Sequence, residues 1–329
     1  MFSFRKSKQQ RILVALGISI SSVQIAILKA VAEDEAAGAA LQHRGQTWQL
    51  VVNDDEPVVN QDHESTIQKL LERYKRFDFN GQSIQVVLST GLVEQISVDK
   101  PEAKAEDIKP TLQWTLKDLV TIPAADLLID YYDLPVQVAG AKKINVVAVS
   151  RSKLQPWVLA LDAVGLRISG IVNLDLALIH WVDHELRTMI VSQVTGERSH
   201  LQIIAKQQLI VSRRLPAAFD LERIDAQDLA TMESLAIELQ RSQDFYSGQL
   251  RQAPLADIEL AFNHSQIDSV AQVIATQLGM QVSTLAYPEW SKELAAGDYS
   301  DILALTGLQW LLHGTEADAK ADASMGNGR

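Results

Sequence analysis

Two histidines have the spacing of helical metal ligands. His180 and His184 lie four residues apart in the run His-Trp-Val-Asp-His, and on a helix such side chains share one face, as in helical zinc sites. The glutamate of the His-Glu-x-x-His motif is absent, and the sequence identifies no third ligand. We therefore predict no metal site and assign the pair to a partly exposed helix end.

Other motifs that carry catalytic chemistry are absent from the sequence. It contains no Gly-x-Ser-x-Gly elbow, no Gly-x-x-x-x-Gly-Lys phosphate loop and no Gly-x-Gly-x-x-Gly turn. The lack of cysteine excludes disulfides, thiolate zinc sites, iron–sulfur clusters and cysteine nucleophiles. The charged pairs Asp54-Asp55, Glu106-Asp107 and Arg213-Arg214 lie in contexts typical of solvated surface. No residue is predicted to be catalytic.

Size and charge limit the classes to which the chain can belong. Its 329 residues, 47% hydrophobic and 22% charged, are typical of a globular protein with two domains or one large composite fold. The net charge of −11 argues against a general nucleic-acid binder, which must neutralise phosphates with lysine and arginine. No stretch approaches the ~20 apolar residues of a spanning helix, so we expect any membrane association to be peripheral or through a partner.

The N-terminus resembles a signal peptide in part. Residues 1–11 are basic and residues 12–28 are largely apolar. Four polar residues interrupt the middle of this apolar run: Ser19, Ser21, Ser22 and Gln24. A signal peptide would have leucine-like residues at these positions. We therefore expect structural strands here. The alternative, an exported envelope protein, stays open, and retention of residues 1–32 in the mature chain would exclude it.

Strand-like and helix-like segments alternate along the chain, which predicts α/β or α+β layers. Residues 12–52 contain strand, turn, strand, loop and strand, and the same order recurs over residues 188–214. A meander that occurs twice, each copy followed by helical sequence, predicts a duplicated domain core. Helices are expected around residues 65–74, which begin with a capping-box pattern at Ser65, and around residues 112–119, 154–164, 174–186 and 233–249.

Five groups of residues, in order, resemble the PilM family of actin-like pilus-assembly proteins. They are Val14-Ala-Leu-Gly-Ile-Ser-Ile-Ser-Ser-Val-Gln-Ile-Ala-Ile-Leu28, Leu116-Lys-Asp-Leu-Val-Thr-Ile-Pro-Ala-Ala-Asp-Leu-Leu-Ile-Asp-Tyr-Tyr132, Asp162-Ala-Val-Gly-Leu166 with Asn173-Leu-Asp175, Glu238-Leu-Gln-Arg-Ser-Gln-Asp-Phe-Tyr246, and Ala304-Leu-Thr-Gly-Leu308. The resemblance spans about residues 10–314. It implies an α/β (α+β), actin-like (ASKHA, FtsA-like) fold of two lobes, each a mixed sheet with flanking helices, plus a small α+β insertion.

The expected boundaries follow from this resemblance. They are a basic segment at 1–11, a first lobe at 12–186 with the insertion at about 96–167, a second lobe at 187–314 and a flexible tail at 315–329.

The two phosphate loops of actin-like ATPases are expected to be degenerate here. Gly17 stands where the first loop has its aspartate, and Gln193 stands where the second loop has its own. The carboxylate that would hold hydrated magnesium is therefore missing. Three further residues differ from the family pattern: Ser19 and Thr195 stand where glycine is expected, and Gln24 stands where lysine is common. The segment on the adenosine side, Leu260-Ala-Phe-Asn-His264, lacks the expected Gly-Gly.

These departures predict a pseudo-ATPase with no cofactor and no enzymatic activity. The degenerate loop positions are Gly17, Ser19, Ser21, Ser22, Gln193, Thr195 and Gly196. Two alternatives stay open. One is a regulatory nucleotide-binding ATPase of the same platform, with ATP and Mg²⁺, and the other is a nucleotide bound without metal through Ser21, Ser22 and backbone amides.

The resemblance also implies partners. Family members bind the short cytoplasmic N-terminal segment of a bitopic inner-membrane protein, here PilN-like or MshJ-like, in a groove between the first lobe and the insertion. By region, the groove is expected along residues 82–98 and 112–132, with candidate contacts at Trp114, Leu119, Ile122, Tyr131 and Tyr132. The implied role is a cytoplasmic scaffold, peripheral at the inner membrane, of a type IV (MSHA-type) pilus platform that includes an assembly ATPase.

Overall fold

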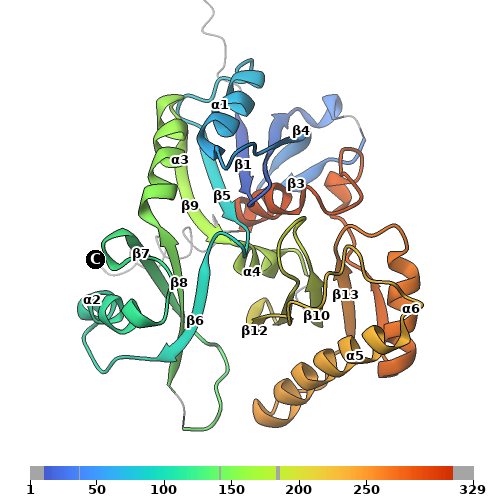
Figure 1. Ribbon diagram of the computed structural model, residues 1–329. Coiled ribbons are helices and arrows are strands. Elements are labelled where there is room, and N and C mark those ends of the chain that lie inside the picture. Colours follow the sequence, from blue (N-terminus) through green and yellow to red (C-terminus); the bar gives the residue numbers. More distant parts are fainter. Residues whose placement is uncertain (1–10, 37, 141, 183–185, 314–329) are drawn as a thin grey trace, which may run out of the picture.

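The computed structural model describes residues 11–36, 38–140, 142–182 and 186–313 (Figure 1). The predicted basic segment, apart from Arg11, the predicted tail 315–329 and His184 lie outside the described residues. In the described part of the chain no helix is long and apolar enough to span a bilayer, and no group of three or more potential metal-ligating side chains comes together.

The first lobe is built on a six-stranded mixed sheet of order β3-β4-β2-β1-β5-β9. Its strands are β1 (Ile12–Ile18), β2 (Ser22–Val31), β3 (Leu41–His43), β4 (Gln46–Pro57), β5 (Ser83–Leu88) and β9 (Arg167–Asn173). β1 pairs antiparallel with β2 and parallel with β5, so it lies at the centre and is apolar on both faces, as buried parallel strands are. Cleavage of residues 1–32 would therefore remove two central strands.

The second lobe repeats this arrangement in a five-stranded sheet of order β12-β11-β10-β13-β14. Its strands are β10 (Arg187–Ser192), β11 (His200–Ala205), β12 (Gln208–Arg214), β13 (Asp257–Ala261) and β14 (Gln281–Thr284). The antiparallel hairpin β10–β11 and the parallel neighbour β13 correspond to β1, β2 and β5 in the first lobe. The duplicated core predicted from the sequence is thus confirmed.

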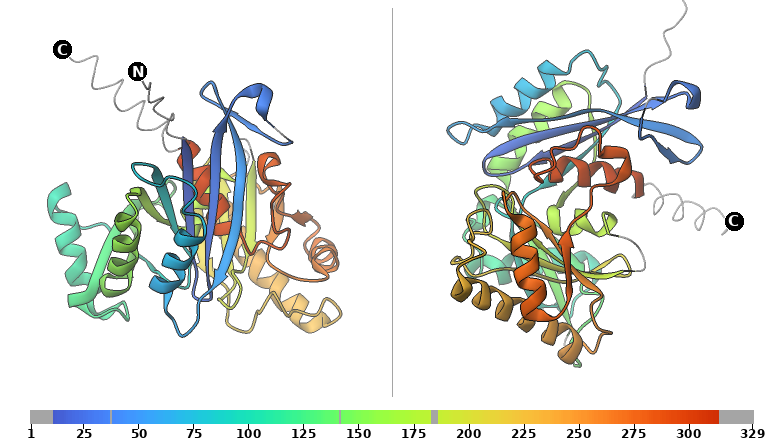
Figure 2. Two further views of the ribbon diagram at one scale, coloured as in Figure 1. Left: turned by 90° about the horizontal axis from the view of Figure 1, so that it is seen from above. Right: turned by 90° about the vertical axis from the view of Figure 1, so that its right-hand side faces the viewer.

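Helices cover the outer face of each sheet, and a further helical layer lies between the sheets. α1 (His63–Arg73) and α3 (Arg151–Ala163) pack on the first sheet, and α5 (Leu229–Asp244) and α6 (Ile267–Leu278) pack on the second. The middle layer contains α4 (Leu174–Ala177) and helical residues 302–313 (Figure 2). The sequence analysis placed residues 302–313 in the second lobe, but in the structure they pack against both sheets.

The insertion is a three-stranded antiparallel sheet of order β6-β8-β7 with one helix on its outer face. Its elements are β6 (Glu94–Asp99), α2 (Ala105–Thr115), β7 (Leu127–Asp133) and β8 (Lys143–Ser150). The predicted insertion boundary near residue 167 is wrong, because α3 belongs to the first lobe. Its Trp157 and Leu161 are buried against the core that also contains Leu70 of α1.

Several local predictions shift for identifiable reasons. Asp62 rather than Ser65 caps α1, since its Oδ1 accepts the Ser65 amide at 3.0 Å. Where a helix was expected at 174–186, the described residues 174–182 form α4 followed by a 3₁₀ turn, Leu178–His180. The helix around 233–249 begins earlier, at Leu229, and ends in a π-helical turn, Phe245–Gln249. The other 3₁₀ turns are Glu33–Glu35, Leu116–Asp118, Ala124–Asp126 and Glu289–Ser291.

One carboxylate of the second sheet faces the middle layer. On β13, Ile258 and Leu260 point to the outer core, so the alternating residues Asp257 and Glu259 lie on the inner face. Burial, and to a lesser extent the negative charge of Asp257, raise the pKa of Glu259 to about 7. The charged form of Glu259 is therefore less favourable in the folded protein than in the unfolded chain.

We expect Glu259→Gln to stabilise the protein at alkaline pH. The unfolded chain loses this proton near pH 4.5 and the folded protein near pH 7, so stability falls across that window as pH rises. The variant lacks this loss, and its free energy of unfolding should exceed that of the wild type by about 3 kcal/mol at about pH 8 but match it near about pH 4. Urea unfolding at the two pH values measures the difference. The exposed control Glu233→Gln should show no such pH-dependent gain, and an equal gain would contradict the assignment.

Candidate functional site

The two loops expected to bind phosphate lie against each other between the lobes. The turn between β1 and β2 carries Ser19 and Ser21, and the turn between β10 and β11 carries Gln193, Thr195 and Gly196. The Ser21 hydroxyl donates to the Thr195 carbonyl oxygen at 3.0 Å, so the loops touch directly. The structure thus brings the predicted loop positions together.

The backbone amides of the first loop are already engaged within the protein. Ser19 Oγ accepts the amides of Ser21 at 3.2 Å and Ser22 at 2.9 Å. The Ser19 amide donates to the Ser22 carbonyl oxygen at 2.9 Å, and the Ile20 amide donates to Glu197 Oε1 at 3.0 Å. Phosphate loops bind through amides that point at the ligand. Here the serine in the expected glycine position supplies the acceptor that a phosphate would supply.

The position of the expected magnesium-holding aspartate has no room for a side chain. A Cβ added to Gly17 would lie 2.4 Å from the Leu303 Cβ and 2.8 Å from the Ala304 nitrogen. Gln24, buried beneath the loop, accepts the Ala304 amide through Oε1 at 3.2 Å. The start of helical segment 302–313 therefore fills this place, and the residues present do not fit Mg-ATP.

The second loop is engaged by carboxylates of its own lobe. Glu222 accepts the Thr195 hydroxyl at 2.6 Å and the Gly196 amide at 3.4 Å. Gln193 donates to Asp220 at 2.8 Å. The adjoining cavity, of about 540 Å³, is lined by both signs of charge: Glu197, Asp220 and Glu222 beside Arg198, Arg214 and Arg223. A nucleotide phosphate here would lie next to the carboxylates that already accept hydrogen bonds from the loop.

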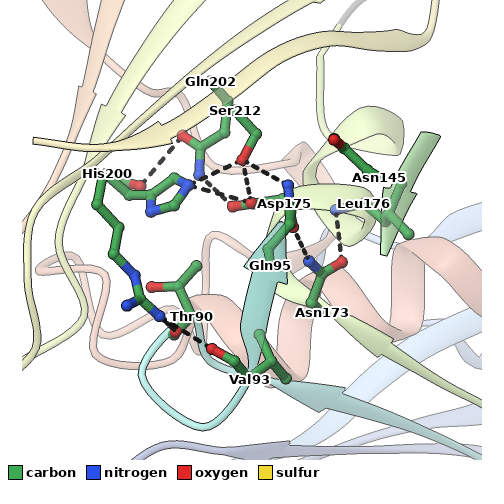
Figure 3. A network of polar contacts seen from close by, with 12 residues as sticks. Thr90, Val93, Gln95, Asn145, Asn173, Asp175, Leu176, His200, Gln202 and Ser212 are labelled. Carbon is green, nitrogen blue, oxygen red and sulfur yellow. Dashed lines mark hydrogen bonds and ion pairs between the residues drawn. The ribbon is translucent and has the colours of Figure 1, made fainter. Parts of the chain in front are cut away.

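A buried polar network, not foreseen from the sequence, ties the lobes together (Figure 3). Asp175, 1% exposed, accepts Gln202 Nε2 at 2.8 Å and Ser212 Oγ at 2.5 Å, and lies 3.1 Å from His200 Nε2. Burial alone would raise the pKa of Asp175, but the charge of His200 and these hydrogen bonds outweigh it and leave that pKa below its ordinary value. The network therefore favours a buried anion that joins α4 to the second sheet.

The same network reaches the insertion but has no catalytic geometry. Gln95 of β6 donates to Ser212 Oγ at 3.1 Å and accepts Asn173 Nδ2 at 2.8 Å. In a serine–histidine–aspartate triad the histidine lies between the other two, bonded through different ring nitrogens. Here His200 Nε2 faces both Asp175 and Ser212, and its buried Nδ1 has no hydrogen-bond partner among the residues that the structure describes. The arrangement positions elements and does not activate a nucleophile.

A second concavity, of about 320 Å³, lies between the first lobe and the insertion. Its walls are β7 and β8 on one side and β9 with α4 on the other; the lining residues are Leu88, Val93, Leu128, Ile129, Asp130, Tyr131, Tyr132, Val147, Val149, Leu154, Ile171, Val172, Asn173 and Leu176. Within the described residues, β7 and β9 are each the last strand of their sheet. We call this concavity the groove. It offers apolar side chains beside two strand edges.

Two of the five predicted partner-contact residues line the groove. Tyr131 and Tyr132 contribute to its wall, and the Tyr132 hydroxyl accepts Asn145 Nδ2 at 3.0 Å, while burial raises the pKa of Tyr132 to about 12. Ile122 packs on the core of the insertion beneath α2. Trp114 and Leu119 are 80% and 54% exposed and do not line the groove. The sequence showed that both residues are apolar but did not show which surface they cover.

Comparisons with known proteins give a fold but no sequence family. No protein-family model matches the chain, and no curated protein matches it. Among solved structures, the chain is similar to the PilM-PilN type IV pilus biogenesis complex, with a TM-score of 0.61 and 13% identity over 92% of this chain and 98% of that chain. A Bacteroides thetaiotaomicron protein of actin-like ATPase fold and unknown function gives a TM-score of 0.51 and 10% identity, over 89% and 98% of the two chains. The cytoplasmic domain of EpsL, an inner-membrane component of the Vibrio cholerae type II secretion system, gives 0.45 and 15%, over 80% and 95%. The predicted actin-like fold is confirmed.

We expect Gly17→Asp to destabilise the protein rather than restore a magnesium site. The new side chain would meet Leu303 and Ala304, so overpacking and a buried charge should together cost about 3 kcal/mol or more. Urea unfolding with and without MgCl₂ measures this cost. The control is Gly248→Asp, where an added Cβ meets nothing within 4 Å. A Gly17→Asp variant of wild-type stability that magnesium stabilises further would show the prediction to be wrong.

Proposed function

We propose that this protein is a nucleotide-independent, PilM-like scaffold of a type IV pilus assembly platform, and within that family an MshI-like component of an MSHA-type system. Its groove binds the extended N-terminal cytoplasmic segment of a bitopic, PilN-like or MshJ-like inner-membrane protein. The observation that carries this proposal is the groove itself, an apolar concavity between the edge strands β7 and β9.

The groove has the two properties that capture of an extended peptide requires. A free strand edge supplies backbone donors and acceptors, and pockets on alternate positions supply specificity. Leu128 and Tyr132 lie on one face of β7 and, across the groove, Ile171 and Leu176 belong to β9 and α4. Polar side chains are few, so the partner segment should insert aliphatic residues. Likeness in fold to a chain solved with PilN supports this choice of partner.

The scaffold function needs no bound nucleotide and no catalytic residue. The first loop's amides are engaged by Ser19 and Glu197, and Gly17 is covered by residues 303 and 304. In the proposed role, the protein lies at the cytoplasmic face of the inner membrane through its partner and contacts the assembly ATPase and other platform proteins there. The competing candidate is a regulatory actin-like ATPase of the same platform.

Peptide binding should depend on the groove and not on the exposed face of α2. Leu128→Asp places a charge in the apolar wall and should weaken binding of a synthetic N-terminal peptide of the MshJ-like protein at least about tenfold. Trp114→Ala should leave the dissociation constant within about twofold. Isothermal titration measures both, and thermal unfolding verifies that each variant folds. The reverse pattern would move the partner surface to α2.

ATP should give no binding heat at millimolar concentration, with or without magnesium. The physical reason is that the amide donors of the first loop have internal acceptors and the magnesium ligand has no place. The same titration cell then receives the peptide, whose binding heat shows that the protein is folded and competent. Magnesium-dependent ATP binding would instead favour the regulatory ATPase.

A further inference from the structure

Glu197 reaches from the second lobe into the first and is only 8% exposed. Its Oε1 accepts the Ile20 amide at 3.0 Å and the Ser89 hydroxyl at 2.5 Å, and its Oε2 accepts the Gly91 amide at 2.7 Å. All three donors belong to the first lobe, in the β1–β2 turn and in the turn after β5. One side chain thus joins two turns of the first lobe to the second lobe.

The donors form a cradle suited to an oxyanion. Two backbone amides and a hydroxyl converge on two oxygens, which is how phosphate and carboxylate groups are held at backbone nests. Gly91 is required for the close approach, because a Cβ there would lie 2.6 Å from Glu197 Cδ. Since both oxygens only accept in this geometry, the cradle fits the anionic carboxylate.

Positive charge is present nearby but is not in contact. Burial raises the pKa of Glu197, and the hydrogen bonds from Ser89, Ile20 and Gly91 together with the charge of Arg214 act against this rise. Arg214 donates to the carbonyl oxygens of Thr90 at 2.7 Å and Val93 at 3.0 Å. It therefore holds the turn that carries two of the three donors in place.

We propose that Glu197 is a built-in ligand of a latent oxyanion site on the first lobe, formed by the amides of Ile20 and Gly91 and the hydroxyl of Ser89. In occupying that site, the carboxylate holds the lobes together, as a bound anion between them would. Removal of the side chain leaves the donors without an acceptor, and a small carboxylate or inorganic phosphate then fills the site.

The site is connected to the groove by a short stretch of chain. Ser89 and Gly91 are followed by Val93, which lines the groove and whose carbonyl oxygen Arg214 binds. Leu88, directly before Ser89, lines it as well. Loss of Glu197 should therefore loosen one wall of the groove, a consequence that rests on the proposed function.

The test compares Glu197→Ala with the wild type and with Glu222→Ala. Glu222 lies between β12 and α5, and its carboxylate accepts hydrogen bonds from Thr195 and Gly196 of its own lobe. Melting temperatures are measured in sodium formate and in sodium chloride of equal ionic strength. In chloride, Glu197→Ala should melt about 5 °C below the wild type. Formate at tens of millimolar should recover about half of that loss, and phosphate should do the same. The melting temperatures of the wild type and of Glu222→Ala should change by less than about 1 °C between the salts.

Two further measurements identify the site. In ¹H–¹⁵N spectra of Glu197→Ala, formate should shift the amides of Ile20 and Gly91, and it should leave them unchanged in the wild type. Glu197→Gln, whose side chain still fills the cradle, should lose stability without recovery by formate. Equal formate effects in all the proteins, or a Glu197→Ala variant as stable as the wild type, would overturn the proposal. If Glu197→Ala refolds in formate but not in chloride, formate has restored stability, and the result supports the proposal. If the variant refolds in neither salt, the proposal is overturned.

None of these measurements uses the peptide, so failure here is distinguishable from failure of the proposed function. A final titration tests the connection between the oxyanion site and the groove. Peptide affinity should fall at least about threefold in Glu197→Ala and return in formate. If formate restores stability but peptide affinity never changes, the anion site stands and its connection to the groove is wrong.

Discussion

The close contact between β1 and helical residues 302–313 is the constraint on which the rest of the structure depends. Two glycines allow it: a Cβ on Gly17 would lie 2.4 Å from the Leu303 Cβ, and a Cβ on Gly307 would lie 2.8 Å from the Ala15 Cβ. Because the helical layer rests directly on the central strand, one continuous apolar core joins both sheets. The space beside the first loop, where an actin-like ATPase would hold metal and phosphate, is therefore occupied by the chain itself.

Polar groups between the lobes are accordingly satisfied from within. Glu197 and Ser19 accept the amides of the first loop, Glu222 engages the second, and Asp175 joins α4 to the second sheet. A buried carboxylate is costly unless it receives hydrogen bonds, and Glu197 and Asp175, which are buried, each receive at least two. The lobes are thus joined by fixed charges, where a nucleotide-binding relative of the fold would use an exchangeable ligand.

Whereas the cavity between the lobes is lined by charged side chains, the groove beside the insertion is an apolar concavity. Its apolar lining and the unpaired edges of β7 and β9 would cost stability or solubility if they served no purpose, since exposed edges invite pairing with other chains. Val93, Asn173 and Leu176 connect the groove to the polar network between the lobes. The groove and the polar network between the lobes therefore share these few residues.

The sequence by itself determined the repeated strand order, the outer helices α1, α3 and α5 and the residue types at the loop positions, because alternation of apolar residues and the identity of a single residue are local properties. It did not determine that α3 belongs to the first lobe or that Trp114 and Leu119 point away from the groove, since an apolar stripe does not name the surface it covers. The tertiary structure alone decided what replaces the lost phosphate ligands. The Ile20 amide and Glu197 are 177 residues apart in sequence, and only the folding of one lobe against the other brings that acceptor to that donor.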